Sequence, residues 1–296
     1  QIDSGTISIG RDEVAGQKLH VVPEERNVGV VFQSYALWPH MSVAGNVGFP
    51  LETSGLSRRE VKARAAECLD TVALSSFAER RPADLSGGQR QRVALARCLA
   101  QSAKTILMDE PLANLDPHLR SAMEEELADF HKRSGATTLF ITHDQREAMA
   151  LADKVAVMWD GQILQVDAPD ALYRRPNSER VAGFIGRSSL PEVHVDHVNG
   201  NKARVLLGTH MLEVDCLDGT EAGPAVLLLR PEHMVPSASG EGIEAIVERT
   251  IYRGGFWEAF VSIEGLDRPL MTILNHRVKP GETLSLNVAA GWVLPK

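Results

Sequence analysis

The chain has 296 residues, of which 44% are hydrophobic and 24% charged, a composition typical of a soluble globular protein with one large or two smaller domains. Its formal net charge of −8 argues against a general nucleic-acid binder, so no nucleic-acid partner is expected. Cys68, Cys98 and Cys216 lie far apart and form neither a disulfide framework nor a zinc motif. No apolar stretch approaches the roughly 20 residues of a membrane span and no signal peptide is visible, so we expect a cytoplasmic location.

Residues 1–182 alternate short β-rich runs with helical segments, which predicts a layered α/β domain. Buried strands are expected at 27–33, 105–109 and 137–142. Helices are expected at 57–72, where Ser57 and Glu60 have capping-box spacing, and at 117–135, where Asp116 is the expected N-cap.

Two further signals follow in the chain. Asp144 and Glu147 have the spacing of a capping box at the start of another helix. The dipeptide Asp160-Gly161 predicts the turn of a hairpin over 154–166.

The remaining residues, 183–296, contain short strands and no strong helical pattern. Asn199-Gly200 predicts one hairpin, and further strand-like runs follow at regular intervals. We therefore expect a separate small all-β domain, a barrel or a sandwich.

The segment SGGQ at 86–89 opens a predicted helix and permits two compatible interpretations. Ser86 and Gln89 satisfy a capping box, which does not require Gly87 or Gly88. Two residues without side chains in the first turn would leave backbone N–H groups uncovered at the positive end of the helix dipole. Such a helix end is an anion site, and a phosphate is its usual occupant.

Three motifs together resemble ATP-binding-cassette (ABC) ATPases. LSGGQ at 85–89 resembles the family's signature motif, TILMDE at 105–110 its Walker B strand, and PLANLD at 111–116 its D-loop. The fold class that this implies is an incomplete ABC-type P-loop ATPase domain with a helical subdomain, over residues 1–182. The β-rich residues 183–296 are similar to the TOBE domain, an OB-like all-β module, of bacterial importer ATPases.

The resemblance implies ATP and Mg²⁺ as ligands, with Asp109 holding Mg²⁺ and Glu110 orienting or deprotonating the attacking water. An alternative is that Asp109 and Glu110 form only a solvated strand end. Asp116, at the end of the D-loop, would contact nucleotide and also cap the following helix.

Two more side chains take roles from the resemblance. His143, which follows the strand TTLFIT, corresponds to the switch histidine that binds the γ-phosphate, although a lone histidine at a strand end is usually structural. Gln33 corresponds to the Q-loop glutamine that contacts Mg²⁺, partly through water, and the attacking water. A glutamine after a strand means little by itself, and its position upstream of LSGGQ supports the role.

The family resemblance also implies partners. Two copies would pair head to tail, so that Ser86, Gly87, Gly88 and Gln89 of one copy cover the nucleotide of the other. Transmembrane permease subunits would contact the apolar region of Tyr35, Leu37 and Trp38, since exposed apolar patches mark partner sites. The intact protein would then lie at the cytoplasmic face of a bacterial inner membrane.

The chain departs from the family in one motif. It contains no Gly-Lys dipeptide and therefore no Walker A motif, G-x-x-x-x-G-K-[ST], which cradles the β- and γ-phosphates. We therefore expect a catalytically incomplete fragment of an importer ATPase. The alternatives are a soluble ABC ATPase without a transport role, and a non-catalytic regulatory module whose β-rich part senses a ligand.

Overall fold

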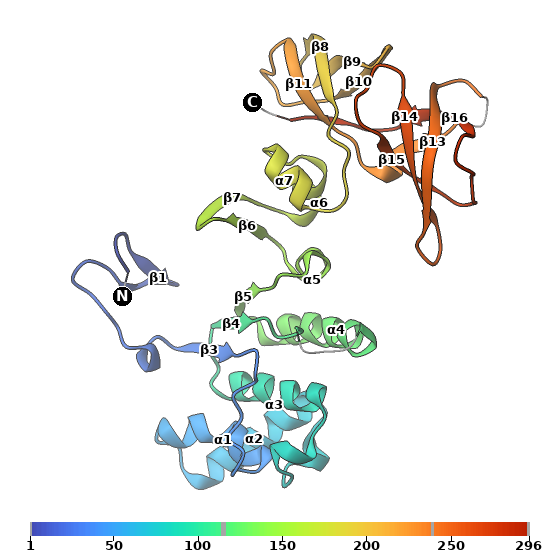
Figure 1. Ribbon diagram of the computed structural model, residues 1–296. Helices are drawn as coiled ribbons and strands as arrows, with labels where there is room; N and C mark the ends of the chain where they lie inside the picture. Colours follow the sequence, from blue (N-terminus) through green and yellow to red (C-terminus); the bar gives the residue numbers. More distant parts are fainter. Residues whose placement is uncertain (1, 114–116, 238–239, 295–296) are drawn as a thin grey trace. The chain divides into compact units, whose positions relative to one another are not determined.

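The computed structural model describes residues 2–113, 117–237 and 240–294 (Figure 1). Contacts divide the chain into two compact units, residues 1–152 and 153–296. The sequence-based domain boundary between residues 182 and 183 stays a prediction.

A parallel sheet with the strand order β3-β4-β5 forms the centre of the first unit. The strands are Val28–Val31 (β3), Thr105–Asp109 (β4) and Thr137–Ile141 (β5), at the three predicted places. Because the strands are parallel and in register, their carboxyl ends lie at one edge of the sheet. A two-stranded antiparallel hairpin precedes them, formed by Ile7–Ile9 (β1) and Asp12–Ala15 (β2).

Five helices are described in this unit, namely Val43–Thr53 (α1), Arg58–Thr71 (α2), Gly87–Ala100 (α3), Pro117–Ser134 (α4) and Gln145–Leu151 (α5). The capping box at the start of α2 is confirmed, since Ser57 accepts from the Glu60 N–H and Glu60 accepts from the Ser57 N–H. The predicted N-cap of α4, Asp116, lies outside the described residues. No helix in the described part of the chain is long and apolar enough to cross a membrane.

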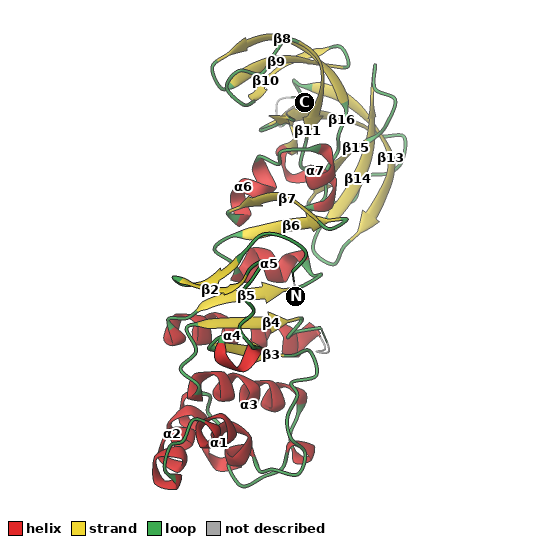
Figure 2. Cartoon of the chain, turned by 90° about the vertical axis from the view of Figure 1, so that its left-hand side faces the viewer, coloured by secondary structure: helices red, strands yellow, loops and turns green. Residues whose placement is uncertain are grey.

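Helix α3 lies between the sheet with α4 on one side and α1 with α2 on the other (Figure 2). It contributes to an apolar cluster on each side. One face packs with the sheet and α4 through Ala94, Leu95 and Cys98. The other face packs with α1 and α2 through Val93, Ala96 and Ala100. A displacement of α3 would therefore disturb both clusters.

The start of α5 differs from the sequence prediction. Asp144 caps the helix as expected, accepting from the Arg146 N–H at 2.9 Å. Glu147, however, is buried and accepts from the Thr142 hydroxyl at 2.5 Å instead of reaching back to the cap. Its other oxygen lies 3.7 Å from Arg120 Nε of α4. The predicted capping box is therefore wrong, because tertiary partners take the Glu147 carboxylate.

The second unit begins with the predicted hairpin, formed by Val155–Trp159 (β6) and Gln162–Asp167 (β7). Asp160 and Gly161 have φ values of 48° and 74°, as a tight hairpin turn requires. Two short helices follow, Pro169–Arg174 (α6) and Glu179–Phe184 (α7).

The rest of the second unit is all-β, as predicted, and has a closed barrel and an open sheet. The barrel has the order β10-β17-β11-β8-β9, with the bounds His210–Asp215 (β10), Trp292–Val293 (β17), Gly223–Leu228 (β11), Glu192–Asn199 (β8) and Lys202–Leu207 (β9). The sheet has the order β12-β16-β13-β14-β15, with the bounds Met234–Pro236 (β12), Thr283–Val288 (β16), Ile243–Tyr252 (β13), Trp257–Ile263 (β14) and Leu270–Leu274 (β15). One apolar cluster is shared by both, with Val205 and Leu227 from the barrel and Val261 and Leu286 from the sheet.

A buried arginine connects the helices of this unit to its β-structure. Arg230 is 1% exposed and donates to the carbonyls of Tyr173 (2.6 Å), Ile185 (2.6 Å) and Arg187 (3.1 Å). Trp292 of β17 adds a hydrogen bond from Nε1 to the Pro176 carbonyl, at 3.1 Å. The segment around α6 and α7 is thereby hydrogen-bonded to the barrel.

Candidate active site

Three side chains from separate parts of the sequence meet at the carboxyl edge of the parallel sheet. Gln33 follows β3, Glu110 follows β4 and His143 follows β5. Gln33 Nε2 donates to Glu110 Oε2 at 3.1 Å, and His143 Nδ1 lies 3.0 Å from Glu110 Oε1. Both oxygens of one carboxylate are therefore held, each by a residue from a neighbouring strand.

The backbone of Glu110 has an unusual conformation. Its φ of 44° lies in the left-handed region, which a residue with a side chain adopts at an energetic cost. Two backbone hydrogen bonds hold it there, from the Glu110 N–H to the Ile141 carbonyl (2.9 Å) and from the Ala113 N–H to the Glu110 carbonyl (3.2 Å). Backbone strain at a side chain with two polar neighbours is typical of functional positions.

His143 is more exposed than Glu110, with 73% of its side chain accessible against 30%. The hydrogen bond to Glu110, together with the negative charge of that carboxylate, raises the pKa of His143 above its usual value. The imidazolium form is therefore favoured while Glu110 is ionised. Because the ring is exposed, it can leave this contact without any change in the core.

Asp109 ends β4 next to Glu110 and is exposed. Its backbone pairs with Ile141 of β5, while its side chain has no hydrogen bond or ion pair with a described residue, so the carboxylate is available to a cation. Among the residues that the structure describes, no group of three or more His, Cys, Asp or Glu could hold a metal ion by itself. Asp109 and the Gln33 amide oxygen offer the hard oxygen ligands that suit Mg²⁺ bound together with phosphates. The residues present therefore fit Mg²⁺ in that role.

The segment 86–89 forms the predicted capping box at the start of α3. Gln89 N–H donates to Ser86 Oγ at 3.3 Å, and Ser86 N–H donates to Gln89 Oε1 at 2.9 Å. No hydrogen bond among the described residues joins this segment to Glu110 and its neighbours. The helix end is therefore a separate feature within one chain.

Gly88 corrects part of the sequence interpretation. The sequence interpretation explains glycine at this position only by uncovered N–H groups. In the structure Gly88 is buried, and a Cβ there would lie 3.3 Å from Met123 Sδ of α4. Close packing of α3 on α4 is thus a second reason for glycine at this position. Asp116, the other predicted nucleotide contact, is outside the described residues.

The loop between β3 and α1 is held by helix residues that sequence reasoning missed. Arg97 of α3 is 7% exposed and donates to the carbonyls of Tyr35 (3.0 Å) and Ala36 (2.8 Å). Asn46 of α1 is fully buried, accepts from the Trp38 N–H at 2.8 Å and donates to the Trp38 carbonyl at 3.1 Å. The one sequence signal was an arginine within the apolar run VALARCLA.

The predicted partner surface in this loop changes in one respect. Tyr35 is 8% exposed and belongs to the apolar cluster of the sheet, so its side chain offers little surface to a partner. Leu37 and Trp38 are half-buried, while Phe32 is 48% exposed. Contact of Leu37 and Trp38 with a partner stays a prediction.

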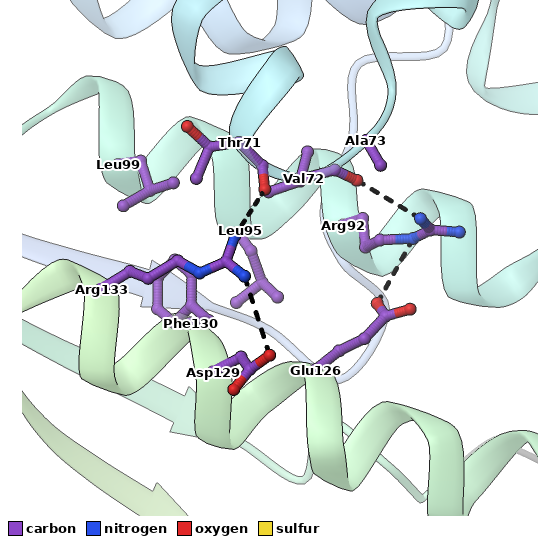
Figure 3. A pocket seen from close by; sticks show the side chains of 10 residues that line it. All are labelled: Thr71, Val72, Ala73, Arg92, Leu95, Leu99, Glu126, Asp129, Phe130 and Arg133. Carbon is purple, nitrogen blue, oxygen red and sulfur yellow. Dashed lines mark hydrogen bonds and ion pairs between the residues drawn. The ribbon is translucent and has the colours of Figure 1, made fainter.

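A cavity of about 210 Å³ lies between the end of α2, α3 and α4 (Figure 3). Leu95, Leu99 and Phe130 form its apolar part. Long polar contacts cross it, with Arg92 Nε 3.4 Å from Glu126 Oε2 and Arg133 Nη1 3.4 Å from the Thr71 carbonyl (Figure 3). None of the residues around Glu110 lines it, so the cavity is not part of the candidate site.

Comparison with known proteins gives two family matches. Residues 1–113 match the ABC transporter family and residues 227–294 match the TOBE domain. The spermidine/putrescine import ATP-binding protein PotA of Pseudomonas aeruginosa (strain UCBPP-PA14) is 41% identical over 305 residues, covering 99% of this chain and 82% of the relative.

Two other relatives are named for different cargo. The Fe(3+) ions import ATP-binding protein FbpC of Agrobacterium fabrum is 40% identical over 257 residues, covering 86% of this chain and 72% of the relative. The sn-glycerol-3-phosphate import ATP-binding protein UgpC of Paracoccus denitrificans is 41% identical over 268 residues, covering 90% and 74%. Similar identity to three such proteins does not single out one cargo.

Proposed function

Because the chain belongs to the ABC transporter family and carries a TOBE domain, we propose that it is an ATP-binding subunit that energises a bacterial importer by hydrolysing ATP. The observation that carries this proposal is the Glu110 carboxylate held between Gln33 and His143 at the sheet edge. Ligands of α/β proteins bind at this edge, where the strands end.

Glu110 is the general base in this proposal. It takes a proton from a water, whose oxygen attacks the γ-phosphorus while the bond to the leaving ADP oxygen breaks. Each carboxylate oxygen has two lone pairs, so Glu110 can accept that proton while its hydrogen bond from Gln33 stays in place. The His143 ring is 73% exposed and its motif position implies contact with the γ-phosphate, so we expect it to leave Glu110 and donate to that phosphate. Gln33 then keeps the other carboxylate oxygen in place.

Mg²⁺ bound with ATP would neutralise phosphate charge, and Asp109 with the Gln33 amide oxygen would hold it. The donor set supports this assignment, because both groups offer oxygen ligands beside Glu110. We also expect Asp116 to contact the nucleotide.

Ser86, Gly87, Gly88 and Gln89 are proposed to contact the γ-phosphate of ATP held by a second copy of the chain. The first N–H groups of a helix lack partners within the helix, and the N-cap of α3, Ser86, is exposed. Closure of the two copies around ATP would then drive transport. The permease partner would contact the region of Leu37 and Trp38 at the cytoplasmic face of the inner membrane.

We further propose that residues 1–296 alone are catalytically incomplete. The sequence has no G-x-x-x-x-G-K-[ST] motif to cradle the phosphates. β5 is an edge strand, with β4 as its sheet partner among the described strands. Leu139 and Ile141 on β5 are 59% and 53% exposed, which is unusual for large apolar residues in a central sheet.

ATP turnover tests the proposal in two arms. Residues 1–296 with Mg·ATP should hydrolyse no faster than their Glu110→Gln variant. A chain extended upstream by a Walker A segment should hydrolyse ATP, and Glu110→Gln should lower its rate by roughly 10²–10⁴-fold, the usual contribution of a general base. Glu52→Gln, an exposed carboxylate elsewhere, is the matched control and should change nothing.

The assignment of Glu110 fails if its glutamine variant keeps the parent rate in the extended chain. The incompleteness proposal fails if residues 1–296 alone show turnover that Glu110→Gln removes.

A further inference from the structure

The loop that follows Gln33 is held in a costly conformation. Tyr35 and Ala36 have φ values of 64° and 44°, so two consecutive residues with side chains are left-handed. Such residues persist only where their surroundings determine the conformation. Any group that maintains this turn also affects where the preceding Gln33 lies.

Arg97 is the side chain that holds the turn. Its Nη2 donates to the Tyr35 carbonyl at 3.0 Å and its Nη1 to the Ala36 carbonyl at 2.8 Å. A guanidinium can bind two adjacent carbonyls at once because its donors form a rigid fork, whereas a lysine ammonium is a single point of contact. Burial lowers the pKa of Arg97, so the cation lies there at an energetic cost that an apolar side chain would avoid.

The far end of the loop is held from another helix. Asn46 of α1 pairs with both backbone groups of Trp38, and the Arg97 guanidinium lies 5.1 Å from the centre of the Trp38 ring. The Tyr35 N–H donates to the Phe32 carbonyl at 2.8 Å, which closes a turn around Gln33 itself. The loop is therefore fixed at both ends, and α3 contacts its middle.

Helix α3 also begins at Ser86 and packs on both apolar clusters of the first unit. We propose that Arg97 is a positioning residue, which transmits the position of α3 to the turn at Tyr35 and Ala36 and so sets Gln33 against Glu110. The inference rests on the proposed function, in which Gln33 and the start of α3 act on nucleotide. A shift of α3 at its phosphate-binding end would then alter the hydrogen bond from Gln33 to Glu110.

The test uses the whole 296-residue chain without nucleotide, so that its outcome does not depend on ATP hydrolysis. The probe is the NMR signal of the Gln33 side-chain amide, identified by its loss in Gln33→Glu. In Arg97→Met this signal should move to the position that it has in Glu110→Ala, where the hydrogen bond to Glu110 is lost. Exchange of the Tyr35 and Trp38 backbone amides should accelerate by about tenfold or more, as expected for a local opening.

The conservative variant and a matched control separate positioning from stability. Arg97→Lys keeps the charge but reaches one carbonyl, so the Gln33 signal should move part of the way. Val93→Ala removes a fully buried side chain of the same helix from the opposite cluster. It should lower the melting temperature while leaving the Gln33 signal at its parent position.

The proposal is overturned if the Gln33 signal stays in place in Arg97→Met and Arg97→Lys, or if Val93→Ala moves it as far as they do. If Arg97→Met does not fold, Arg97→Lys alone decides. A failed ATP turnover experiment with an intact Gln33 response would instead refute the proposed function and leave the positioning role standing.

Discussion

The two units both bury an arginine against backbone carbonyls, but in different settings. In the first unit Arg97 holds a loop next to an exposed glutamine and an open sheet edge. In the second, Arg230 connects the segment around α6 and α7 to a closed barrel. The same interaction therefore holds a loop beside the candidate site in one unit and joins helices to a barrel in the other.

The parallel sheet of the first unit and the barrel of the second differ in how completely they cover their apolar residues. On β5 of the first unit, Leu139 and Ile141 are more than half exposed. The barrel of the second unit has no free edge, and its inward-facing residues, such as Val195 and Val205, are fully buried. Full coverage is a property of the barrel and not of the whole second unit, since Met158 and Ile163 of the β6–β7 hairpin are 64% and 59% exposed.

The largest expected effect concerns where the second unit begins. A fragment of residues 153–296 should melt cooperatively and be more stable than one of residues 186–296 by about 3 kcal/mol or more, because the shorter fragment lacks several carbonyls that accept from charged Arg230. It also lacks the Pro176 carbonyl that accepts from Trp292. Urea denaturation followed by tryptophan fluorescence would measure the difference.

Arg230→Met is the control for that comparison. It should destabilise the longer fragment strongly and the shorter one much less, since most partners of Arg230 are then absent. Equal stability of the two unmodified fragments would support the sequence-based boundary at 182/183 and remove the structural role given to α6 and α7.

A smaller effect is expected when the capping boxes at Ser57 and Ser86 are compared in stability and in ATP-driven pairing. Ser57→Ala and Ser86→Ala should each lower stability by about 1 kcal/mol, because both remove an N-cap oxygen from the same local motif. In the chain extended by a Walker A segment, with Glu110→Gln to slow hydrolysis, only Ser86→Ala should weaken ATP-driven pairing. Thermal melts and light scattering measure the two quantities.

Ser57→Ala supplies the comparison, since it has the local cost without the phosphate contact. If both variants pair as their parent does, the start of α3 is only a capped helix end. Gly88 is less suitable for this test than Ser86, because a side chain there would also press on Met123.

The smallest effect is a change in the titration of His143. Glu110 raises the pKa of His143, so Glu110→Gln should lower that pKa toward the ordinary value of about 6.5. Because the folded pKa is the raised one, the attraction is fully present below the unfolded pKa and is lost as pH rises through the folded pKa. An NMR titration of the His143 ring measures this, with exposed His197 as the control. An unchanged His143 pKa would mean that the pair does not form in solution.

Much of the local structure follows from the sequence alone. The three parallel strands, the boxes at Ser57 and Ser86 and the turn at Asp160-Gly161 all form where the pattern predicts them. Each depends on neighbours within a few residues, so short-range spacing carries the information. The family resemblance of the motifs also predicts Gln33, Glu110 and His143 as site residues. All three follow parallel strands, whose carboxyl ends lie at one edge of the sheet and so bring these residues together.

Other features were decided only by tertiary packing. Glu147 contacts Thr142 and Arg120 and does not complete the predicted capping box. Gly88 packs against Met123, and the side chain of Tyr35 is buried in the core. The role of Arg97 depends on carbonyls about sixty positions earlier in the chain. Spacing along a helix cannot reveal such partners, because a buried polar group takes whichever acceptor the packed fold brings within hydrogen-bond distance.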